Sequence, residues 1–290
     1  MRGIRSLLFV PGDSERKIAK ALTCAADALI LDLEDSVTPD RKPAAREICR
    51  AALAAGSKGP KLFVRINALD TPEAAADLAA VVRGGPFGVV VPKCQSARDL
   101  LRLDDMLTVL EAREGSAPRQ TLVLPIVTET GRAMLGFNSY AETQVPRLFG
   151  MMWGAEDLSA DLGAKSNRDE AGRGYAQPYQ LARSMCLYAA AATGCAAIDA
   201  VFTDIRNERG LEEEAIFASR SGFVAKAAIH PGQVEIINRS FMPTADEIAH
   251  AKQVVEAFSA IDAKGVAVLD GRMLDKPHHR AALRVLAAAE

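Results

Sequence analysis

The sequence predicts a (β/α)8 barrel followed by a C-terminal extension, and three observations lead to that fold class. Eight short apolar runs are spread along the chain, the stretches between them have helical spacing, and each run ends in a polar or glycine-containing turn. Runs without polar alternation are typical of strands buried on both faces, as in a parallel sheet covered by helices. In such a barrel the active site forms where the strands end and the following loops begin.

The eight predicted strands are short and rich in valine, isoleucine, leucine and phenylalanine. In chain order they cover residues 6–12, 28–35, 61–67, 87–93, 121–129, 148–157, 197–204 and 223–231. Segments between them, such as EAAADLAAVVR and LEEEAIFASRS, place apolar residues three and four positions apart, as crossover helices require. The interval between the sixth and seventh strands is the long one. It contains the polar, glycine-containing stretch 161–180, which we expect to cover the site.

The extension begins after the eighth predicted strand. Thr244 is a predicted helix N-cap, and Glu247 three residues later completes a capping-box pattern. A short strand or turn and a final helix follow. We therefore expect a catalytic barrel domain over residues 1–242 and an extension over 243–290 that serves as a lid and as a contact between subunits.

The composition is that of an ordinary globular protein with a large core. Of the 290 residues, 49% are apolar and 25% are charged, which are usual values for soluble domains. The formal net charge of −2 and the single tryptophan argue against a nucleic-acid partner, because such binding depends on basic surfaces and stacking aromatic residues.

Cysteine usage and hydropathy bear on location. The five cysteines are scattered, without the close pairs typical of zinc or redox sites. No apolar stretch approaches the ~20 residues that span a bilayer, and no signal-peptide pattern precedes the first strand. We expect a cytoplasmic protein with reduced thiols and no membrane partner.

Two acidic residues end the fifth and sixth predicted strands. Glu129 closes LVLPIVTET, and Asp157 closes RLFGMMWGAED. Because these strands are neighbours in the barrel, we expect the two carboxylates to converge on one point above it. Mg²⁺ typically takes one or two protein carboxylates and completes its shell with water and substrate oxygens, so the pair predicts a magnesium site. The alternative is that either acid merely caps the following helix.

Arg65 ends the apolar strand KLFVRIN, where burial of a guanidinium is costly unless it meets an anion. A substrate carboxylate or enolate is the expected partner. The alternative partner is Asp32 or Glu34 in LDLEDS, and both pairings can hold at once. We expect these acids and Asp35 to orient Arg65, or the waters around the metal, rather than to bind the metal directly.

Two lysines and three histidines complete the candidate chemistry. Lys93 in VVVPK and Lys226 in FVAKAAIHP lie at or near strand ends, where a lysine can form a Schiff base with a ketone. Nearby acids favour a paired, protonated lysine instead, and we place Lys93 among the groups that support the metal site. His230 is either a base or part of the IHPGQ turn, whereas His278 and His279 are expected to face solvent.

Eight sequence blocks, taken together and in order, carry a further signal. They are RSLLFVPG at 5–12, ALILDLEDSVTPDRKPAAR at 28–46, VRIN at 64–67, VVVPK at 89–93, PIVTET at 125–130, GAEDLSADLG at 154–163, AIHPGQV at 228–234 and DGRMLD at 270–275. Over almost its full length the chain resembles the citrate lyase beta-subunit-like proteins of the HpcH/HpaI aldolase/citrate lyase family. One block alone is weak evidence, whereas eight in order make coincidence improbable.

The resemblance implies a magnesium-dependent lyase or synthase that cleaves or forms a carbon–carbon bond in a 3-hydroxyacyl thioester. Substrates of this kind are citryl, malyl or citramalyl groups on coenzyme A or an acyl carrier, and the products are a 2-oxo acid or glyoxylate and an acyl thioester. Carried over by motif, Glu129 and Asp157 look like the magnesium ligands. Arg65 looks like the residue that holds the 2-oxo acid, with Glu129 also near the substrate.

The resemblance also implies a role for the extension and for assembly. Asp275 matches an acid that family members lend to a neighbouring subunit's active site, and we expect it to transfer the proton of the thioester enolate. Asp270, in the same block, is a second acid of interest. Homo-oligomers, often trimers or hexamers, would follow.

Three other functions are compatible with the same residues. The enolate chemistry can end in thioester hydrolysis, the lysines can run a metal-free aldol cleavage, or the chain can be a non-catalytic subunit of a larger lyase complex. The combination of Arg65, Glu129, Asp157 and Asp275 argues against the inert version.

Overall fold

The computed structural model describes residues 3–172, 174–260 and 265–289. Its main sheet has eight parallel strands in the order β5-β4-β3-β2-β1-β8-β7-β6, and parallel bridges from Val123 to Leu148 and from Ile126 to Met152 bring β5 beside β6. The predicted (β/α)8 barrel is therefore confirmed. The strands are β1 (Ser6–Pro11), β2 (Ala28–Asp32), β3 (Lys61–Arg65), β4 (Gly88–Val91), β5 (Leu122–Pro125), β6 (Gly150–Met152), β7 (Ala196–Asp199) and β8 (Ala225–Ala228).

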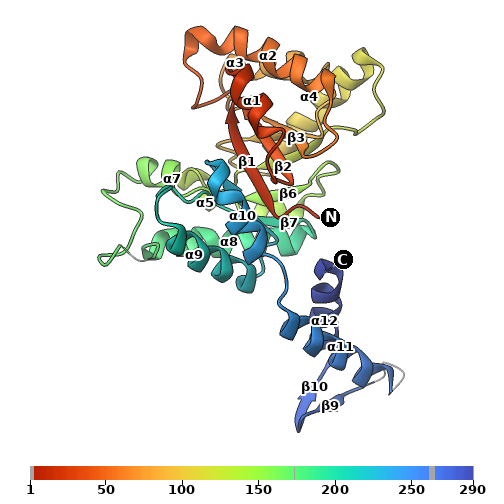
Figure 1. Ribbon diagram of the computed structural model, residues 1–290. Coiled ribbons are helices and arrows are strands. Elements are labelled where there is room, and N and C mark those ends of the chain that lie inside the picture. Colours follow the sequence, from red (N-terminus) through yellow and green to blue (C-terminus); the bar gives the residue numbers. More distant parts are fainter. Residues whose placement is uncertain (1–2, 173, 261–264, 290) are drawn as a thin grey trace.

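Helices follow the strands and cover the outside of the barrel (Figure 1). They are α1 (Glu15–Ala21), α2 (Lys42–Ala55), α3 (Glu73–Val82), α4 (Ala97–Glu114), α5 (Gly131–Leu135), α6 (Asn138–Glu142), α7 (Glu156–Asp161), α8 (Gln177–Thr193), α9 (Glu208–Ser221) and α10 (Val234–Ser240), with 3-10 turns at η1 (Pro39–Arg41) and η2 (Pro231–Gln233). The predicted runs include loop residues beyond the strands. Glu129 lies between β5 and α5, and Asp157 lies in the first turn of α7, so neither acid is itself a strand residue.

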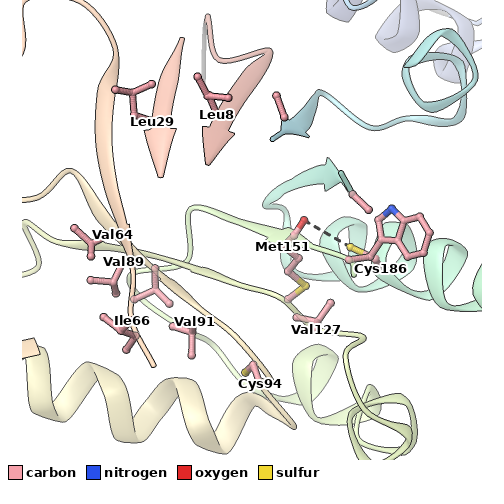
Figure 2. Packing of buried hydrophobic residues seen from close by; sticks show 14 of the residues in the cluster. Leu8, Leu29, Val64, Ile66, Val89, Val91, Cys94, Val127, Met151 and Cys186 are labelled. Carbon is pink, nitrogen blue, oxygen red and sulfur yellow. Dashed lines mark hydrogen bonds between the residues drawn. The ribbon is translucent and has the colours of Figure 1, made fainter. Parts of the chain in front are cut away.

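Each strand contributes to two apolar layers. In β2, Ala28 and Ile30 belong to a cluster inside the barrel, whereas Leu29 and Leu31 belong to the larger cluster beneath the helices. Figure 2 shows part of that outer cluster, where the thiol of Cys186 on α8 donates to a main-chain carbonyl of β6. Because successive side chains of a strand point to opposite faces, burial of both faces explains why the runs lack polar alternation.

Three phenylalanines fill the barrel interior near the amino ends of the strands. Phe63, Phe87 and Phe149 have ring centroids 5.2, 5.3 and 5.8 Å apart, with tilted or edge-on rings, an arrangement that aromatic pairs prefer. The interior is therefore packed at that end, and the carboxyl ends of the strands are left for a site.

Gly12 allows β1 to pack closely where the strand ends. A Cβ at this position would lie 2.6 Å from the carbonyl oxygen of Asp32 and 2.7 Å from the sulfur of Cys49. We expect Gly12→Ala to lower the free energy of unfolding by about 1–3 kcal/mol, because buried groups must shift to admit the methyl. Urea denaturation checks this, with Gly59→Ala as the control because its nearest atom is 3.8 Å away. Equal losses in both variants would contradict the expectation.

The extension consists of α11 (Ala245–Ser259), a hairpin of β9 (Ala267–Leu269) and β10 (Arg272–Leu274), and α12 (Lys276–Ala289). It has its own small apolar cluster, and in Figure 1 it projects from the barrel. The capping box of Thr244 and Glu247 is confirmed at the start of α11. This separate cluster supports the division into units over 1–242 and 243–290, which stays a proposal.

Local geometry explains Asp270. This residue has φ of +47° and precedes Gly271 with φ of +73°, at the turn between β9 and β10. An Asp-Gly pair with positive φ at both positions is favoured in two-residue hairpins. The turn thus accounts for Asp270 without a catalytic role.

Among the described residues, no helix is long and apolar enough to cross a bilayer.

Candidate active site

A cavity of about 430 Å³ opens at the carboxyl ends of the strands. The predicted site residues Arg65, Glu129 and Asp157 all line it, and Asp32 does so beside Arg65. Much of the remaining lining is apolar and includes Phe9, Ile126, Met152, Trp153, Val201 and Ile229. The cavity therefore combines a few charged groups with apolar side chains, as expected for a site that binds a small ligand.

Arg65 is held in one orientation by two acids. Its Nε and Nη2 atoms donate to the carboxylate of Asp32 at 2.7 and 2.8 Å, and Nη1 lies 2.9 Å from Glu34. The ring of Phe9 lies beneath the guanidinium, 4.9 Å from its carbon to the ring centroid. The ion pairs of Arg65 with Asp32 and Glu34, which the sequence offered as the alternative to a substrate anion, are therefore present. Arg65 nevertheless lines the cavity.

These contacts keep Arg65 and Asp32 in their charged forms. Burial acts to lower the pKa of Arg65, but the hydrogen bonds and charge of Asp32 outweigh it and raise the pKa. Burial acts to raise the pKa of Asp32, but Arg65 outweighs it and the net shift is downward. Because both groups remain ionised and paired, Arg65 is a fixed cation at the cavity wall.

Glu129 is a buried carboxylate, only 3% exposed. Its Oε2 accepts the backbone N–H of Lys93, whose φ of +53° lies in the left-handed region and directs that N–H toward the carboxylate. Burial raises the pKa of Glu129 to about 8 despite this hydrogen bond, and the charges of Asp157 and Glu34 add to the rise. A buried acid in this state is stabilised by any cation that reaches it.

Lys93 also joins the other acids of the site. Its ammonium contacts Glu34 and lies 3.3 Å from Asp157. Burial acts to lower the pKa of Lys93, but the hydrogen bond that its ammonium donates to Glu34 outweighs this effect and raises the pKa. A lysine that is paired and protonated is not a nucleophile, so these contacts disfavour Schiff-base chemistry at Lys93. Lys93 thus touches Glu129 through its backbone and Asp157 through its side chain.

The donor set fits magnesium. Among the described residues, no group of three or more His, Cys, Asp or Glu side chains is placed to hold a metal, so the site offers a carboxylate pair and not a closed cage. Structural zinc sites need four protein ligands and catalytic ones three, whereas Mg²⁺ uses one or two carboxylates and keeps water. Oε2 of Glu34 is buried and pairs with Nη1 of Arg65 at 2.9 Å, so Glu34 supports Arg65. Glu129 and Asp157 are the acids of this set that line the cavity, and they are the ones that would hold a hydrated cation.

The raised pKa of Glu129 has a consequence for stability. In the metal-free protein the folded state holds the proton up to about pH 8, whereas the unfolded chain releases it near the ordinary value of 4.5. Stability therefore falls as the pH rises between these values. A cation that binds Glu129 at low pH would have to displace that proton. We expect a fixed Mg²⁺ concentration to raise Tm more at about pH 8.5 than at about pH 6, measured by differential scanning fluorimetry. Equal shifts at both pH values would contradict this expectation.

Lys226 and the histidines have structural partners. Lys226 is fully buried and donates to Asp199, Glu214 and the carbonyl oxygen of Ala200, which disfavours a Schiff base there too. His230 caps η2, since its Nδ1 accepts the N–H of Gly232 and Gln233 completes the capping box. The turn interpretation of IHPGQ is thus the one that the geometry favours.

In the extension, Asp275 and the two histidines lie outside the cavity lining of their own chain. Asp275 immediately precedes α12 and pairs with His278 at 2.5 Å. His278 is exposed as expected, but the prediction for His279 is wrong in part, because its ring stacks on Phe258 at 4.8 Å and is half-buried. The role of Asp275 in a neighbouring site stays a prediction.

The expectation that residues 161–180 cover the site is wrong for the part of this segment that the structure describes. Arg168 and Tyr175 line a second cavity of about 920 Å³ beside α8 and α9, and no described residue of 161–180 lines the cavity at the strand ends. The physical reason is an ion pair of Arg168 with Glu214 at 2.9 Å and its stacking on Tyr175, which hold the segment against α9.

Sequence reasoning missed Trp153 and Asp199. Trp153 follows β6 and lines the cavity, and its indole N–H donates to Asp199 at 2.6 Å. Trp153 lies in the same predicted run as Asp157, and a tryptophan close in sequence to a predicted ligand could have been identified as a candidate. Asp199 ends β7 without any neighbouring polar residue that would distinguish it from a helix cap.

These features define a barrel protein with a buried acid and a fixed arginine in a cavity at the carboxyl ends of its strands. The chain belongs to the HpcH/HpaI aldolase/citrate lyase family, whose model matches residues 5–231.

Individual relatives are similar over almost the whole chain. A (3S)-malyl-CoA thioesterase of Cereibacter sphaeroides is 36% identical, over 99% of this chain and 94% of the relative. The citrate lyase subunit beta of Escherichia coli is 35% identical, over 99% and 93%. Among solved structures, the protein CitE of Mycobacterium tuberculosis in complex with magnesium, acetoacetate and coenzyme A has a TM-score of 0.79 at 35% identity, with 99% of this chain and 98% of that chain covered. The chain is thus similar to citrate lyase beta-subunit proteins.

A second solved structure is similar over a shorter stretch. The citrate lyase beta subunit of M. tuberculosis complexed with oxaloacetate and magnesium has a TM-score of 0.69 at 38% identity, with 82% of this chain and 96% of that chain covered.

Proposed function

We propose that this chain is a magnesium-dependent carbon–carbon lyase or synthase that acts on a 3-hydroxyacyl thioester of the citryl-, malyl- or citramalyl-CoA type. Its products are a 2-oxo acid or glyoxylate and an acyl thioester. The observation that carries the proposal is that the fixed cation Arg65 and the buried carboxylate Glu129 line the same cavity. Relatives whose structures contain magnesium with coenzyme A or with oxaloacetate support the same ligand classes.

In this proposal Glu129 and Asp157 hold Mg²⁺, which as a Lewis acid polarises the oxygens of the oxo-acid fragment when it is bound. Arg65 binds the carboxylate of that fragment and offsets the negative charge that develops as the bond breaks. Asp32 and Glu34 orient Arg65, and Lys93 orients Glu129 through its N–H. Such support of the groups that touch the substrate fixes their geometry before reaction, and this lowers the barrier.

Cleavage moves two protons. The substrate hydroxyl gives its proton to solvent water as the oxo group forms, and the electrons of the broken carbon–carbon bond pass to the thioester enolate. The enolate carbon then takes a proton, for which we propose Asp275 of a neighbouring subunit. The extension over 243–290 then acts as lid and subunit contact in a homo-oligomer, a trimer or hexamer, and we place this protein in the cytoplasm.

Thioester hydrolysis is the second candidate, because a relative with 36% identity bears the name (3S)-malyl-CoA thioesterase. The same cavity would bind the same substrate, and water would attack the thioester carbonyl. Metal-free aldol cleavage is disfavoured by the paired state of Lys93 and Lys226. A purely non-catalytic role is also disfavoured, because it would give no function to the charged residues that line the cavity.

A product assay distinguishes these candidates. Malyl-, citramalyl- and citryl-CoA are incubated with the protein in Mg²⁺, and the oxo acid is measured with phenylhydrazine and the free thiol with a thiol reagent. A lyase releases oxo acid without free coenzyme A, whereas a hydrolase releases free coenzyme A without oxo acid. EDTA should abolish either activity. Trapping of a substrate adduct by borohydride in the presence of EDTA would contradict the metal-dependent proposal.

A further inference from the structure

Trp153 connects the cavity wall to a group of buried charges. It is the single tryptophan of the chain, it is 1% exposed, and it lies between the last residue of β6 and the turn that carries Asp157. Its indole N–H donates to Oδ1 of Asp199 at 2.6 Å. The indole ring and the ring of Tyr175 meet edge to face, with their centroids 4.8 Å apart. The position of the ring is therefore set from behind the cavity.

Asp199 is fixed by two cations. Arg183 on α8 binds both of its oxygens at 3.0 and 2.9 Å, and Lys226 on β8 donates at 2.7 Å. All three side chains are buried. Burial acts to raise the pKa of Asp199, but Lys226 and Arg183 outweigh it and the net shift is downward, so the carboxylate remains ionised. We call Asp199, Arg183 and Lys226 the Asp199 cluster.

The Asp199 cluster is poorly explained by stability alone. Buried ion pairs lose solvation and often contribute no more than an apolar group of the same volume. They do, however, restrain geometry, because each buried charge must stay close to its partners. A stiff support of this kind is most useful where the supported atoms must be placed accurately.

The supported atoms belong to the proposed metal site. Gly154, next to Trp153, exchanges two hydrogen bonds with the hydroxyl of Thr128: its N–H donates at 2.8 Å, and its carbonyl accepts at 3.0 Å. Thr128 directly precedes Glu129, and the Trp153–Gly154 pair leads into the turn of Asp157. Gly154 also packs against Glu129, since an added Cβ would lie 3.1 Å from the Cγ atom of Glu129. One short segment thus packs against one proposed ligand, Glu129, and leads along the chain to the other, Asp157.

We propose that Asp199 and Trp153 are positioning residues for the magnesium site. Asp199 fixes the indole, and the indole fixes the segment that holds Glu129 and leads to Asp157, so that both carboxylates face one cation. This inference rests on the proposed function, because it assumes a cation between the two acids.

Trp153→Phe tests the link, since it keeps an aromatic ring and removes the indole N–H. Asp199→Asn removes the negative charge that accepts the indole N–H of Trp153. We expect both variants to bind Mg²⁺ at least ~10-fold more weakly than the wild type, the size of effect that outer partners of metal ligands show. Binding is measured without substrate, as the Mg²⁺ concentration that gives half of the rise in Tm. In the wild type and Asp199→Asn, the fluorescence of the single tryptophan gives an independent measurement.

A matched control lies at the other end of β6. Arg147 precedes this strand and is fully buried in ion pairs with Asp104 and Glu111. Glu111→Gln therefore disturbs a comparable buried cluster at the start of the segment that leads into β6, and we expect it to lower Tm without changing Mg²⁺ affinity. A merely structural role for Asp199 predicts the same pattern in Asp199→Asn, with Tm lowered and Mg²⁺ affinity unchanged.

The outcomes separate the two proposals. Weaker Mg²⁺ binding in Trp153→Phe and Asp199→Asn, with normal binding in Glu111→Gln, supports the positioning role. Wild-type affinity in both variants overturns it and leaves the proposed function intact. If the wild-type protein shows no response to Mg²⁺ in either measurement, the metal site and the positioning role are both overturned.

Discussion

Glu129→Gln is expected to lower the Mg²⁺-dependent activity by roughly 10³-fold, because loss of a Lewis acid removes several kcal/mol of transition-state stabilisation. The amide oxygen can still accept the N–H of Lys93, so the fold should persist. Stability without metal should be equal or higher, since a buried acid whose pKa is raised to about 8 is replaced by a neutral group. Activity assays and Mg²⁺-dependent Tm measure both effects.

Glu142→Gln is the control for this variant. Glu142 is an exposed carboxylate at the end of α6, in the same connection between β5 and β6, and its replacement should leave Mg²⁺ binding and activity unchanged. Full activity in Glu129→Gln, together with the wild-type response of Tm to Mg²⁺, would contradict the metal assignment.

Arg65→Lys is expected to lower kcat/KM by about 10²–10³-fold. A lysine is a point charge that cannot make the two parallel contacts of the guanidinium with Asp32 and at the same time reach Glu34 and an oxo acid. Inhibition by free oxo acid should weaken in parallel, while the rise of Tm with Mg²⁺ should remain. This combination separates loss of substrate binding from loss of the metal.

Complete removal of the guanidinium of Arg65 should also destabilise the fold. Arg65→Ala leaves Asp32 buried without its cation and Glu34 with Lys93 alone, and we expect a loss of about 3–5 kcal/mol in the free energy of unfolding. Arg46→Lys is the matched control, because Arg46 binds Asp77 at 2.7 Å in a comparable network away from the cavity. It should lower stability and keep oxo-acid inhibition. If free oxo acid inhibits the Arg65→Lys variant as strongly as it inhibits the wild type, the assigned role of Arg65 is contradicted.

The strands were predictable because their burial is local in sequence. Each of the eight runs is apolar on both faces, and each coincides with an observed strand. The ends were less accurate, because the residues that follow β5 and β6 are also buried and a hydrophobic run does not report where hydrogen bonding to the next strand stops. Glu129 and Asp157 were therefore assigned to strands, although they lie in the turns beyond.

The pairing of Arg65 depends on register. Asp32 and Arg65 are direct neighbours across β2 and β3, and this adjacency fixes which acid the guanidinium meets. The sequence contains both residues but not the alignment of the two strands, so it left the substrate and the acids as alternative partners. The alignment follows from packing of the whole barrel.

The amino-acid sequence by itself determined the barrel, the charged residues at its rim and the family, because apolar periodicity and motif order are properties of the linear chain. Tertiary structure alone decided three further things: the placement of Asp199 behind Trp153, the attachment of Arg168 to α9, and the separation of Asp275 from the cavity of its own chain. Each depends on contacts between segments distant in the chain, and buried charges select partners only when folding brings those segments together.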